Sequence, residues 1–192
     1  MYFFHLTIDV QTGCNDRYEA YKIDAVDIAA RAEGHVWSLV VRPTDSERNL
    51  YYQISGWRSE RELDRSGSSA DNRALIERAR PYEMLNTTPA LREPGALTVG
   101  PPPLLDVDGP TAWPCLHRTH RFASEASMTR MVESRAGCSE QSHTHILLKV
   151  DGGPMKVYEF VIGTCSVREN VTSIGLAEPP REMDCRIIAL SR

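Results

Sequence analysis

Four side chains that could bind or polarise a small molecule recur at every second position of one short segment. The run Asn49-Leu-Tyr-Tyr-Gln-Ile-Ser-Gly-Trp57 carries a phenol, an amide, a hydroxyl and an indole at positions 51, 53, 55 and 57. Because side chains alternate between the two faces of a β-strand, Tyr51, Gln53, Ser55 and Trp57 are expected on one side of a sheet. By itself this pattern also fits a core aromatic residue at a strand end, or a sheet face that is open to water.

A second group of candidate residues is rich in histidine. It consists of His117, His120, His143 and His145. On a strand, the spacing His143-x-His145 places both rings on one face, which a Zn, Fe or Cu site could use. The glutamate that a cupin-type metal motif needs after such a pair is absent, as is its downstream histidine. We therefore predict no bound metal and assign His143 and His145 to substrate contact.

The segments around the first group follow a regular order. Residues 3–10 alternate and predict a strand, and a capping pattern at Asp16 opens an amphipathic helix that ends near Gly34. Two strands at 35–42 and 49–57 are joined by a polar turn. A helical stretch from Ser59 to about Met84, loosened at Gly67, and an extended segment near 90–92 complete the order β-α-β-β-α-β. This is the order of a ferredoxin-like α+β unit.

These segments resemble the antibiotic biosynthesis monooxygenase family. In that family a Gly-led strand, here starting at Gly34, a short polar turn, and a strand ending in Trp before a Ser/Glu-capped helix, here Trp57 and Ser59, occur in this order. The resemblance covers roughly residues 1 to 95. It implies the dimeric α+β barrel fold, with the face of Gln53 and Trp57 lining a cavity.

The resemblance also implies a reaction. Cofactor-independent members oxidise aromatic polyketide phenols or anthrones with O₂, so that the protein supplies a dry pocket, a proton acceptor and donors for the developing oxyanion. On this basis Trp57 and Gln53 are predicted as catalytic hydrogen-bonding groups and His5 as the base, whose ordinary pKa is near 6.5. Tyr51, Ser55 and Trp37 are predicted to bind the substrate. The family's haem-degrading members use a histidine on the second helix, and residues 59–84 contain none.

The second half is predicted to repeat the first. It contains strands near 115–122, 143–150, 156–163 and 185–190 and a helix behind Ser124, with a second helix reduced to 167–180. A Pro- and Gly-rich stretch separates the halves. We predict a ferredoxin-like domain at 1–97, a linker at 98–111 and a degenerate second ferredoxin-like domain at 112–192, two tandem units that together form one barrel.

Composition excludes several classes of protein. Hydrophobic residues make up 41% and charged residues 25% of the chain, which is typical of a soluble globular protein. The net charge is −4 without a block of like charge, so neither nucleic acid nor a membrane is an expected partner. The five cysteines form no CxxC pair and no signal segment is recognisable, which indicates a reducing, cytoplasmic location.

The sequence therefore predicts a cofactor-independent monooxygenase of antibiotic or other secondary-metabolite biosynthesis that takes a small aromatic substrate and O₂. If the chain associates further, the expected assembly is a homodimer. Three alternatives stay open. They are a polyketide cyclase or aromatase of the same fold, a metal-dependent oxygenase that uses the second-half histidines, and a non-catalytic ligand-binding protein.

Overall fold

The computed structural model describes residues 1–44, 48–87, 90–99, 114–136, 143–152, 155–163 and 176–191. Its strands form a closed barrel in the order β1-β3-β2-β8-β5-β7-β6-β4, and every neighbouring pair is antiparallel. The strands are β1 (Tyr2–Asp9), β2 (His35–Pro43), β3 (Leu50–Trp57), β4 (Leu91–Val99), β5 (Cys115–Arg121), β6 (His143–Val150), β7 (Lys156–Gly163) and β8 (Arg181–Ser191). The predicted α+β class and barrel are confirmed.

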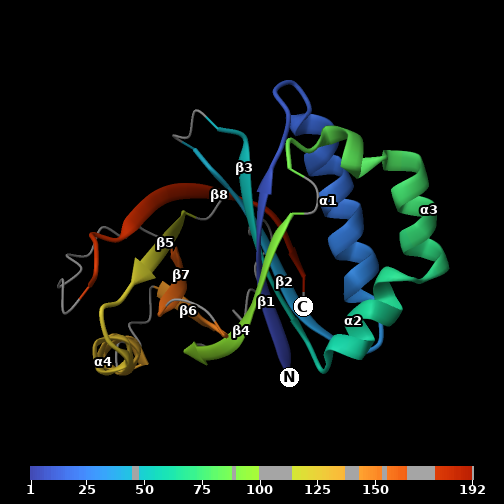
Figure 1. Ribbon diagram of the computed structural model, residues 1–192. Helices are drawn as coiled ribbons and strands as arrows, with labels where there is room; N and C mark the ends of the chain where they lie inside the picture. Colours follow the sequence, from blue (N-terminus) through green and yellow to red (C-terminus); the bar gives the residue numbers. More distant parts are fainter. Residues whose placement is uncertain are drawn as a thin grey trace.

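The helices cover the outside of this barrel at two places (Figure 1). On one side lie α1 (Asn15–Ala30), α2 (Glu60–Gly67), α3 (Ala70–Ala79) and the short 3-10 helix η1 (Pro81–Met84). On the other side, α4 (Glu125–Ala136) lies beside the second-half strands. The interruption predicted at Gly67 is the boundary between α2 and α3.

The two halves contribute four strands each in the same spatial order. In the first half the order is β4-β1-β3-β2 and in the second it is β8-β5-β7-β6, that is, fourth, first, third, second in both. Two seams join the halves, β2 with β8 and β4 with β6, and they close the sheet. The predicted linker falls largely on residues 100–113, and the predicted reduced helix largely on residues 164–175, which lie outside the described residues. The domain boundaries stay a prediction, and β4 extends to Val99.

Local sequence signals explain where the helices begin. The Ser59 hydroxyl accepts a hydrogen bond from the Glu62 backbone N–H at 3.3 Å and contacts the Glu62 carboxylate at 3.0 Å, so the predicted capping box opens α2. The prediction of a cap at Asp16 is wrong, because α1 begins at Asn15 after Cys14, which makes no side-chain cap. Gly34 has φ +85°, a conformation that favours glycine, and a Cβ there would meet the Glu62 side chain.

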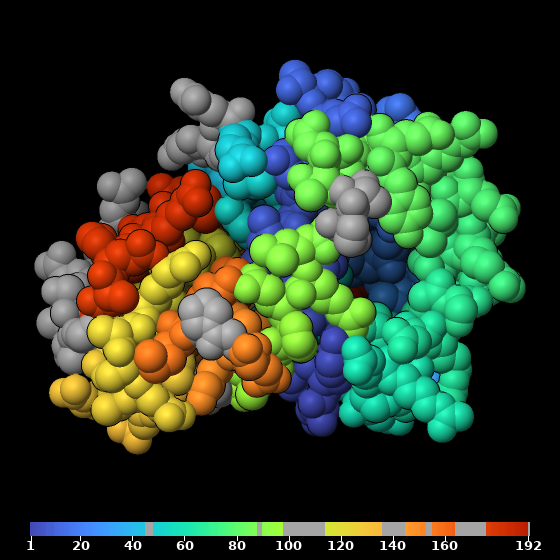
Figure 2. Space-filling model, viewed as in Figure 1, coloured from blue at the N-terminus to red at the C-terminus, as the bar shows by residue number. Residues whose placement is uncertain are grey.

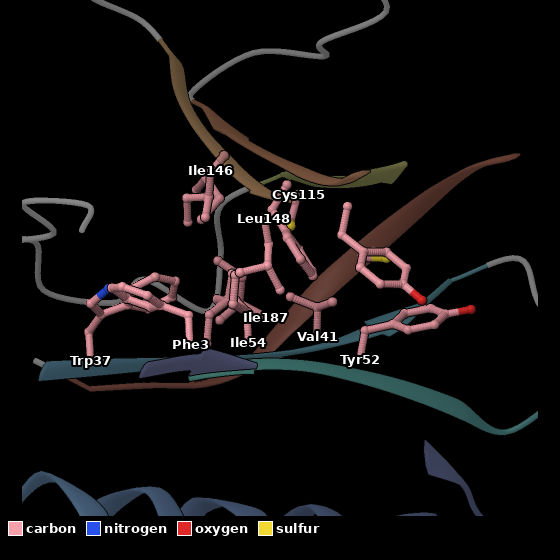
Figure 3. Packing of buried hydrophobic residues seen from close by; sticks show 14 of the residues in the cluster. Phe3, Trp37, Val41, Tyr52, Ile54, Cys115, Ile146, Leu148 and Ile187 are labelled. Carbon is pink, nitrogen blue, oxygen red and sulfur yellow. The ribbon is translucent and has the colours of Figure 1, made fainter. Parts of the chain in front are cut away.

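The barrel interior holds one apolar core to which both halves contribute (Figure 3). Its buried members are Phe3, Trp37, Leu39, Val41, Leu50, Tyr52, Ile54, Cys115, Ile146, Leu148, Val150, Tyr158, Phe160, Ile162, Cys185 and Ile187. A second cluster packs the outer face of the first-half sheet against α1. As a result β2 and β3 are buried on both faces, and β1, where a half-buried strand was expected at residues 3–10, is largely buried on both as well. Figure 2 shows the two halves forming one continuous body.

Candidate active site

Three of the four alternating side chains of β3 line a cavity on the helix-covered face of the sheet. Gln53, Ser55 and Trp57 border a space of about 210 Å³, which we call the helix-side cavity. Its other walls come from β1, β2, α1, α2 and α3, including Phe4, Leu6, Tyr21, Lys22, Ala25, Ser38, Leu63 and Asn72. The sequence correctly placed these β3 side chains on one face and beside a helix.

Lys22 brings an amine into this cavity from α1. The residue is 8% exposed, and its Nζ donates a hydrogen bond to Gln53 Oε1 at 2.8 Å. The rings of Tyr18 and Tyr21 each lie 5.7 Å from Nζ. Burial lowers the pKa of Lys22 to about 8. An appreciable fraction of the amine is therefore neutral near pH 7 to 8 and able to accept a proton.

A chain of hydrogen bonds runs along one wall of the cavity. His35 Nε2 lies 3.0 Å from Ser38 Oγ, which in turn lies 2.6 Å from Ser55 Oγ. Burial lowers the pKa of His35 to about 4, so its ring is neutral at neutral pH. With the ring proton on Nε2, His35 donates to Ser38 and Ser38 donates to Ser55. The hydrogen of Ser55 then remains for a molecule in the cavity.

Trp57 fixes the end of this chain. Its Nε1–H donates to Ser55 Oγ at 3.1 Å, and its ring meets the His35 ring edge to face with centroids 5.0 Å apart. The indole is 2% exposed. Trp57 thus lies at the cavity as predicted, while its N–H is engaged by the serine.

Tyr51 shares this face of β3 but is not among the residues that line the cavity. Its hydroxyl lies 2.8 Å from Glu19 Oε1 and 3.0 Å from Asn15 Oδ1. Both partners belong to the first turns of α1. Tyr51 therefore attaches the helix that carries Lys22 to the strand that carries Gln53.

His5 and Trp37 lie on the opposite face of the sheet, inside the barrel. Both His5 and Trp37 are at most 1% exposed, and Trp37 belongs to the interior core cluster. His5 stacks on Tyr158 with centroids 3.6 Å apart. The structure therefore does not bring either residue together with Gln53 and Trp57. The reason is strand alternation: on β1, Phe4 and Leu6 face the helix-side cavity, so His5 between them points inward.

The corresponding outer face of the second half is occupied by a buried ion network. The Glu159 carboxylate lies 2.9 Å from His120 Nε2 and 3.0 Å from His145 Nδ1. Arg118 and Arg135 reach the same carboxylate at 3.4 and 3.3 Å. Burial by itself would raise the pKa of Glu159, but the hydrogen bonds from the two histidines and the charge of Arg135 hold it well below its usual range. Glu159 is thus a buried carboxylate that stays ionised.

The second-half histidines are divided between the two faces of the barrel. His145 and His120 bind Glu159 on the outside, whereas His117 is fully buried in the interior. The His143 side chain lies outside the described part of the chain. Among the described residues, no group of three or more His, Cys, Asp or Glu side chains could hold a metal ion. Of the four histidines of the metal alternative, the three whose side chains are described do not form one group, since His117 lies on the other face of the barrel from His120 and His145.

Comparisons with solved structures identify the fold. Two proteins described as "putative monooxygenase", from Lactobacillus acidophilus NCFM and Fusobacterium nucleatum subsp. nucleatum, match with TM-scores of 0.75 and 0.79 at 9% and 6% identity. The matches cover 99% and 100% of this chain and 95% and 94% of theirs. An anthrone oxidase-like protein matches with a TM-score of 0.62 at 11% identity, over 98% of this chain and 92% of its own. This chain has their fold.

The shared fold extends over the whole chain, and not only over the first half to which the sequence resemblance applies. No protein-family model and no curated protein sequence matches the chain. In the described part of the chain, none of the helices is long and apolar enough to cross a membrane.

The sequence pattern did not point to Lys22 and Ser38 of the cavity wall, nor to His35, which contacts Ser38 from behind it. One signal could have found Lys22. The buried positions of α1 are Tyr18, Lys22 and Val26, spaced by four, so a lysine stands in the apolar stripe of this helix. His35 and Ser38 carry no comparable signal, because a bulge between His35 and Trp37 shifts the register of β2.

Proposed function

We propose that this protein is a cofactor-independent monooxygenase that oxidises a small phenol or anthrone of the aromatic polyketide type with O₂ in the helix-side cavity. The observation that carries the proposal is the buried amine of Lys22, held 2.8 Å from Gln53 and facing the same cavity as Ser55 and Trp57. A base, a hydroxyl donor and an apolar wall thus border one cavity, which is what proton removal from a weak carbon or phenol acid requires.

The proposed reaction begins with proton transfer from the substrate to the neutral Lys22 amine, which leaves a substrate carbanion or phenolate. This anion gives one electron to O₂, and the resulting radical and superoxide combine to a peroxide. Lys22 returns its proton to form the hydroperoxide. Loss of the second C–H proton and cleavage of the O–O bond then release water and leave a carbonyl, so the substrate supplies all the electrons and O₂ supplies the new oxygen.

Ser55 is the proposed donor to the developing oxyanion, with Trp57 and Ser38 as positioning residues that orient its hydroxyl. Gln53 is a positioning residue as well, because its Oε1 holds the Lys22 ammonium. In this scheme Lys22 replaces His5 as the base. The change is required by geometry, since His5 lies across the sheet from the cavity.

The fold supports the proposal. Structures described as monooxygenase-type and anthrone oxidase-like proteins share it over almost the whole chain. We further propose that each half is a ferredoxin-like unit, and that the two units in tandem make a barrel of the dimeric α+β type. At about 210 Å³ the cavity is smaller than the roughly 300–1,000 Å³ typical of ligand sites, which favours a compact substrate with few fused rings.

The test is turnover of anthrone by chelator-treated protein under air and under nitrogen. We expect conversion to the quinone, with O₂ uptake, only under air and faster than the autoxidation seen with a Lys22→Met variant. Equal conversion under both gases would overturn the proposal. A product formed by loss of water without gain of oxygen, from a polyketone substrate, would instead identify the cyclase alternative.

A further inference from the structure

A second and larger cavity opens at one end of the barrel, on the inner face of the same strands. Its volume is about 570 Å³, within the range of roughly 300–1,000 Å³ that is usual for small-molecule sites. It is lined from β1, β3, β5, β7 and β8, and so from both halves of the chain. We call it the barrel-mouth cavity.

Two tyrosine rings held by histidines line this cavity. The Tyr52 ring stacks on His117 at 4.1 Å between centroids with an interplanar angle of 9°, and the Tyr158 ring stacks on His5 at 3.6 Å and 10°. Tyr52 and Tyr158 line the cavity, whereas both histidines are fully buried behind them. Each tyrosine is only 5% exposed, and Lys156 Nζ lies 4.8 Å from the Tyr158 ring centroid, so a ligand would meet the part of Tyr52 that reaches the cavity. Stacking on His117 fixes the plane of that ring.

Among the described residues at the mouth of this cavity, each cationic side chain except Arg181 has an ion-pair partner. Arg48 pairs with Asp9 at 3.0 Å, Arg121 pairs with Glu178 at 3.0 Å, and Lys156 pairs with Glu93. The guanidinium of Arg181 makes no ion pair or hydrogen bond with any residue in the described ranges, although it also lines the cavity. Among the described residues, three carboxylates thus pair with three of the four cations, and Arg181 is the fourth.

Tyr52 lies close enough to Arg181 to feel its charge. Arg181 lies on β8 opposite Thr119 of β5, and its charge acts on the Tyr52 hydroxyl. The Tyr52 hydroxyl makes only a weak contact, with Met183 Sδ at 3.5 Å. A ligand that places a ring beside Tyr52 would therefore bring a carboxylate on that ring to Arg181.

We infer that the barrel-mouth cavity binds a small planar aromatic carboxylate, with its ring beside Tyr52 and its negative charge on Arg181. A guanidinium suits this ligand because its planar array of N–H donors matches the two oxygens of a carboxylate. The site is separate from the helix-side cavity. On β3, Tyr52 faces the barrel mouth while its neighbour Gln53 faces Lys22, so the two cavities lie on opposite sides of one strand.

Calorimetric titration with three probes tests the inference: naphthoate, its uncharged counterpart naphthylmethanol, and acetate. We expect naphthoate to bind and the other two to bind at least about tenfold more weakly, since each lacks either the charge or the ring. Arg181→Gln should weaken naphthoate by about tenfold or more. Because Arg181 is exposed, this variant is expected to fold normally.

Arg186→Gln is the matched control, because it removes the same charge from the same strand on the outer face, where Arg186 pairs with Glu19. It should leave naphthoate binding unchanged. Tyr52→Leu should weaken naphthoate without changing the weak affinity for acetate. Equal loss in the Arg181 and Arg186 variants, or acetate binding as tightly as naphthoate, would overturn the inference.

Discussion

The two half-sheets have the same strand order, but the outer face of the first borders a cavity and that of the second is filled by a buried ion network. β3 and β7 are each the third strand of their half and each eight residues long, so Gln53 and Glu159 occupy corresponding positions. Gln53 meets one buried amine beside a cavity. Glu159 meets two histidines and two arginines and is fully buried among them. One amide-to-carboxylate difference thus separates a face with room for a ligand from a face filled by charge pairs.

The next two outward-facing positions of β3 and β7 also differ between the halves. Where β3 continues with Ser55 and Trp57, β7 has Val161 and Gly163 at the corresponding places. At these two positions β3 therefore carries a hydroxyl and an indole, and β7 carries neither. The two halves therefore share a strand order while their outer faces carry different side chains.

Removing the Lys22 amine should have the largest effect on the oxidation rate. Lys22→Met is expected to lower the rate of O₂-dependent anthrone oxidation by about a hundredfold to ten-thousandfold, the usual contribution of a general base. The fold should persist, because methionine fills the same apolar space. The measurement is O₂ uptake, with thermal unfolding alongside it. Lys149→Met, at an exposed lysine that pairs with Glu125, is the control and should keep the full rate; a fully active Lys22→Met protein would contradict the proposed base.

Breaking the ion network should affect stability and not chemistry. Glu159→Gln removes the charge shared by two arginines and two histidines but leaves Arg118 its Glu182 partner at 2.7 Å, so we expect the free energy of unfolding in urea to fall by about 3 kcal/mol. The rate per folded molecule should stay unchanged. For comparison, Glu125→Gln removes an exposed carboxylate and should change stability by less than about 1 kcal/mol. Lost activity in fully folded Glu159→Gln would show that the second half takes part in the reaction.

The pH dependence of stability should reveal the buried amine. The pKa of Lys22 is about 8 in the folded protein against 10.5 for a free lysine, so between these values the unfolded chain binds more protons. The stability contributed by Lys22 therefore rises with pH across this window, by up to about 3 kcal/mol. Urea unfolding of wild type and Lys22→Met at pH 8 and above measures it as a difference between the two proteins. Parallel curves would mean that the amine has an ordinary pKa.

Replacing Gln53 by glutamate, the residue at the corresponding position of the second half, should shift the pH dependence of the oxidation rate. Gln53→Glu places a carboxylate beside Lys22 and should raise the pKa of the amine by about 1–3 units, because an opposite charge favours the ammonium. The rate of the wild type is expected to rise with pH around pH 8, the pKa of Lys22, and that of the variant to rise at higher pH. Gln11→Glu makes the same change at an exposed position. If both variants keep the wild-type profile, Lys22 is not the titrating group.

The smallest expected effect on the oxidation rate is that of replacing Trp57, and it can be compared with replacing Trp37, the other buried tryptophan of the first half. Trp57→Phe removes the donor to Ser55 and should lower the rate by about five- to tenfold, the value of one hydrogen bond. Trp37→Phe serves as the control, because Trp37 faces the barrel interior and its Nε1 has no hydrogen-bond partner among the described residues. Equal rates in the two variants would remove Trp57 from the site.

Much of the fold could be predicted because it depends on local patterns. The strands at 143–150 and 156–163 have the predicted bounds, since each is an apolar run that ends at turn residues. Ser59 marks the start of α2, because its hydroxyl caps the first turn of the helix. The site was predicted in part for the same reason: alternation along β3 groups Gln53, Ser55 and Trp57.

The remaining assignments failed where both faces of a strand are buried. Alternation separates His5 from Phe4 and Leu6, yet it does not say which side faces the helices and which faces the barrel interior. His5 was placed with the wrong group because the inner face of β1 is also covered, by the second half of the chain. The register shift in β2 likewise hid His35 and Ser38 from any simple two-residue spacing.

By itself, then, the sequence determined the secondary structure, the repeated strand order and the chemistry that one face of β3 could offer. Only the tertiary structure decided that the two halves close into one barrel, that α1 places Lys22 against Gln53, and that His117 and His120 lie on different faces. The physical reason is that hydrogen bonding and side-chain alternation act over a few residues. Barrel closure, helix docking and the desolvation that lowers the pKa of Lys22 depend on contacts between segments far apart in the chain.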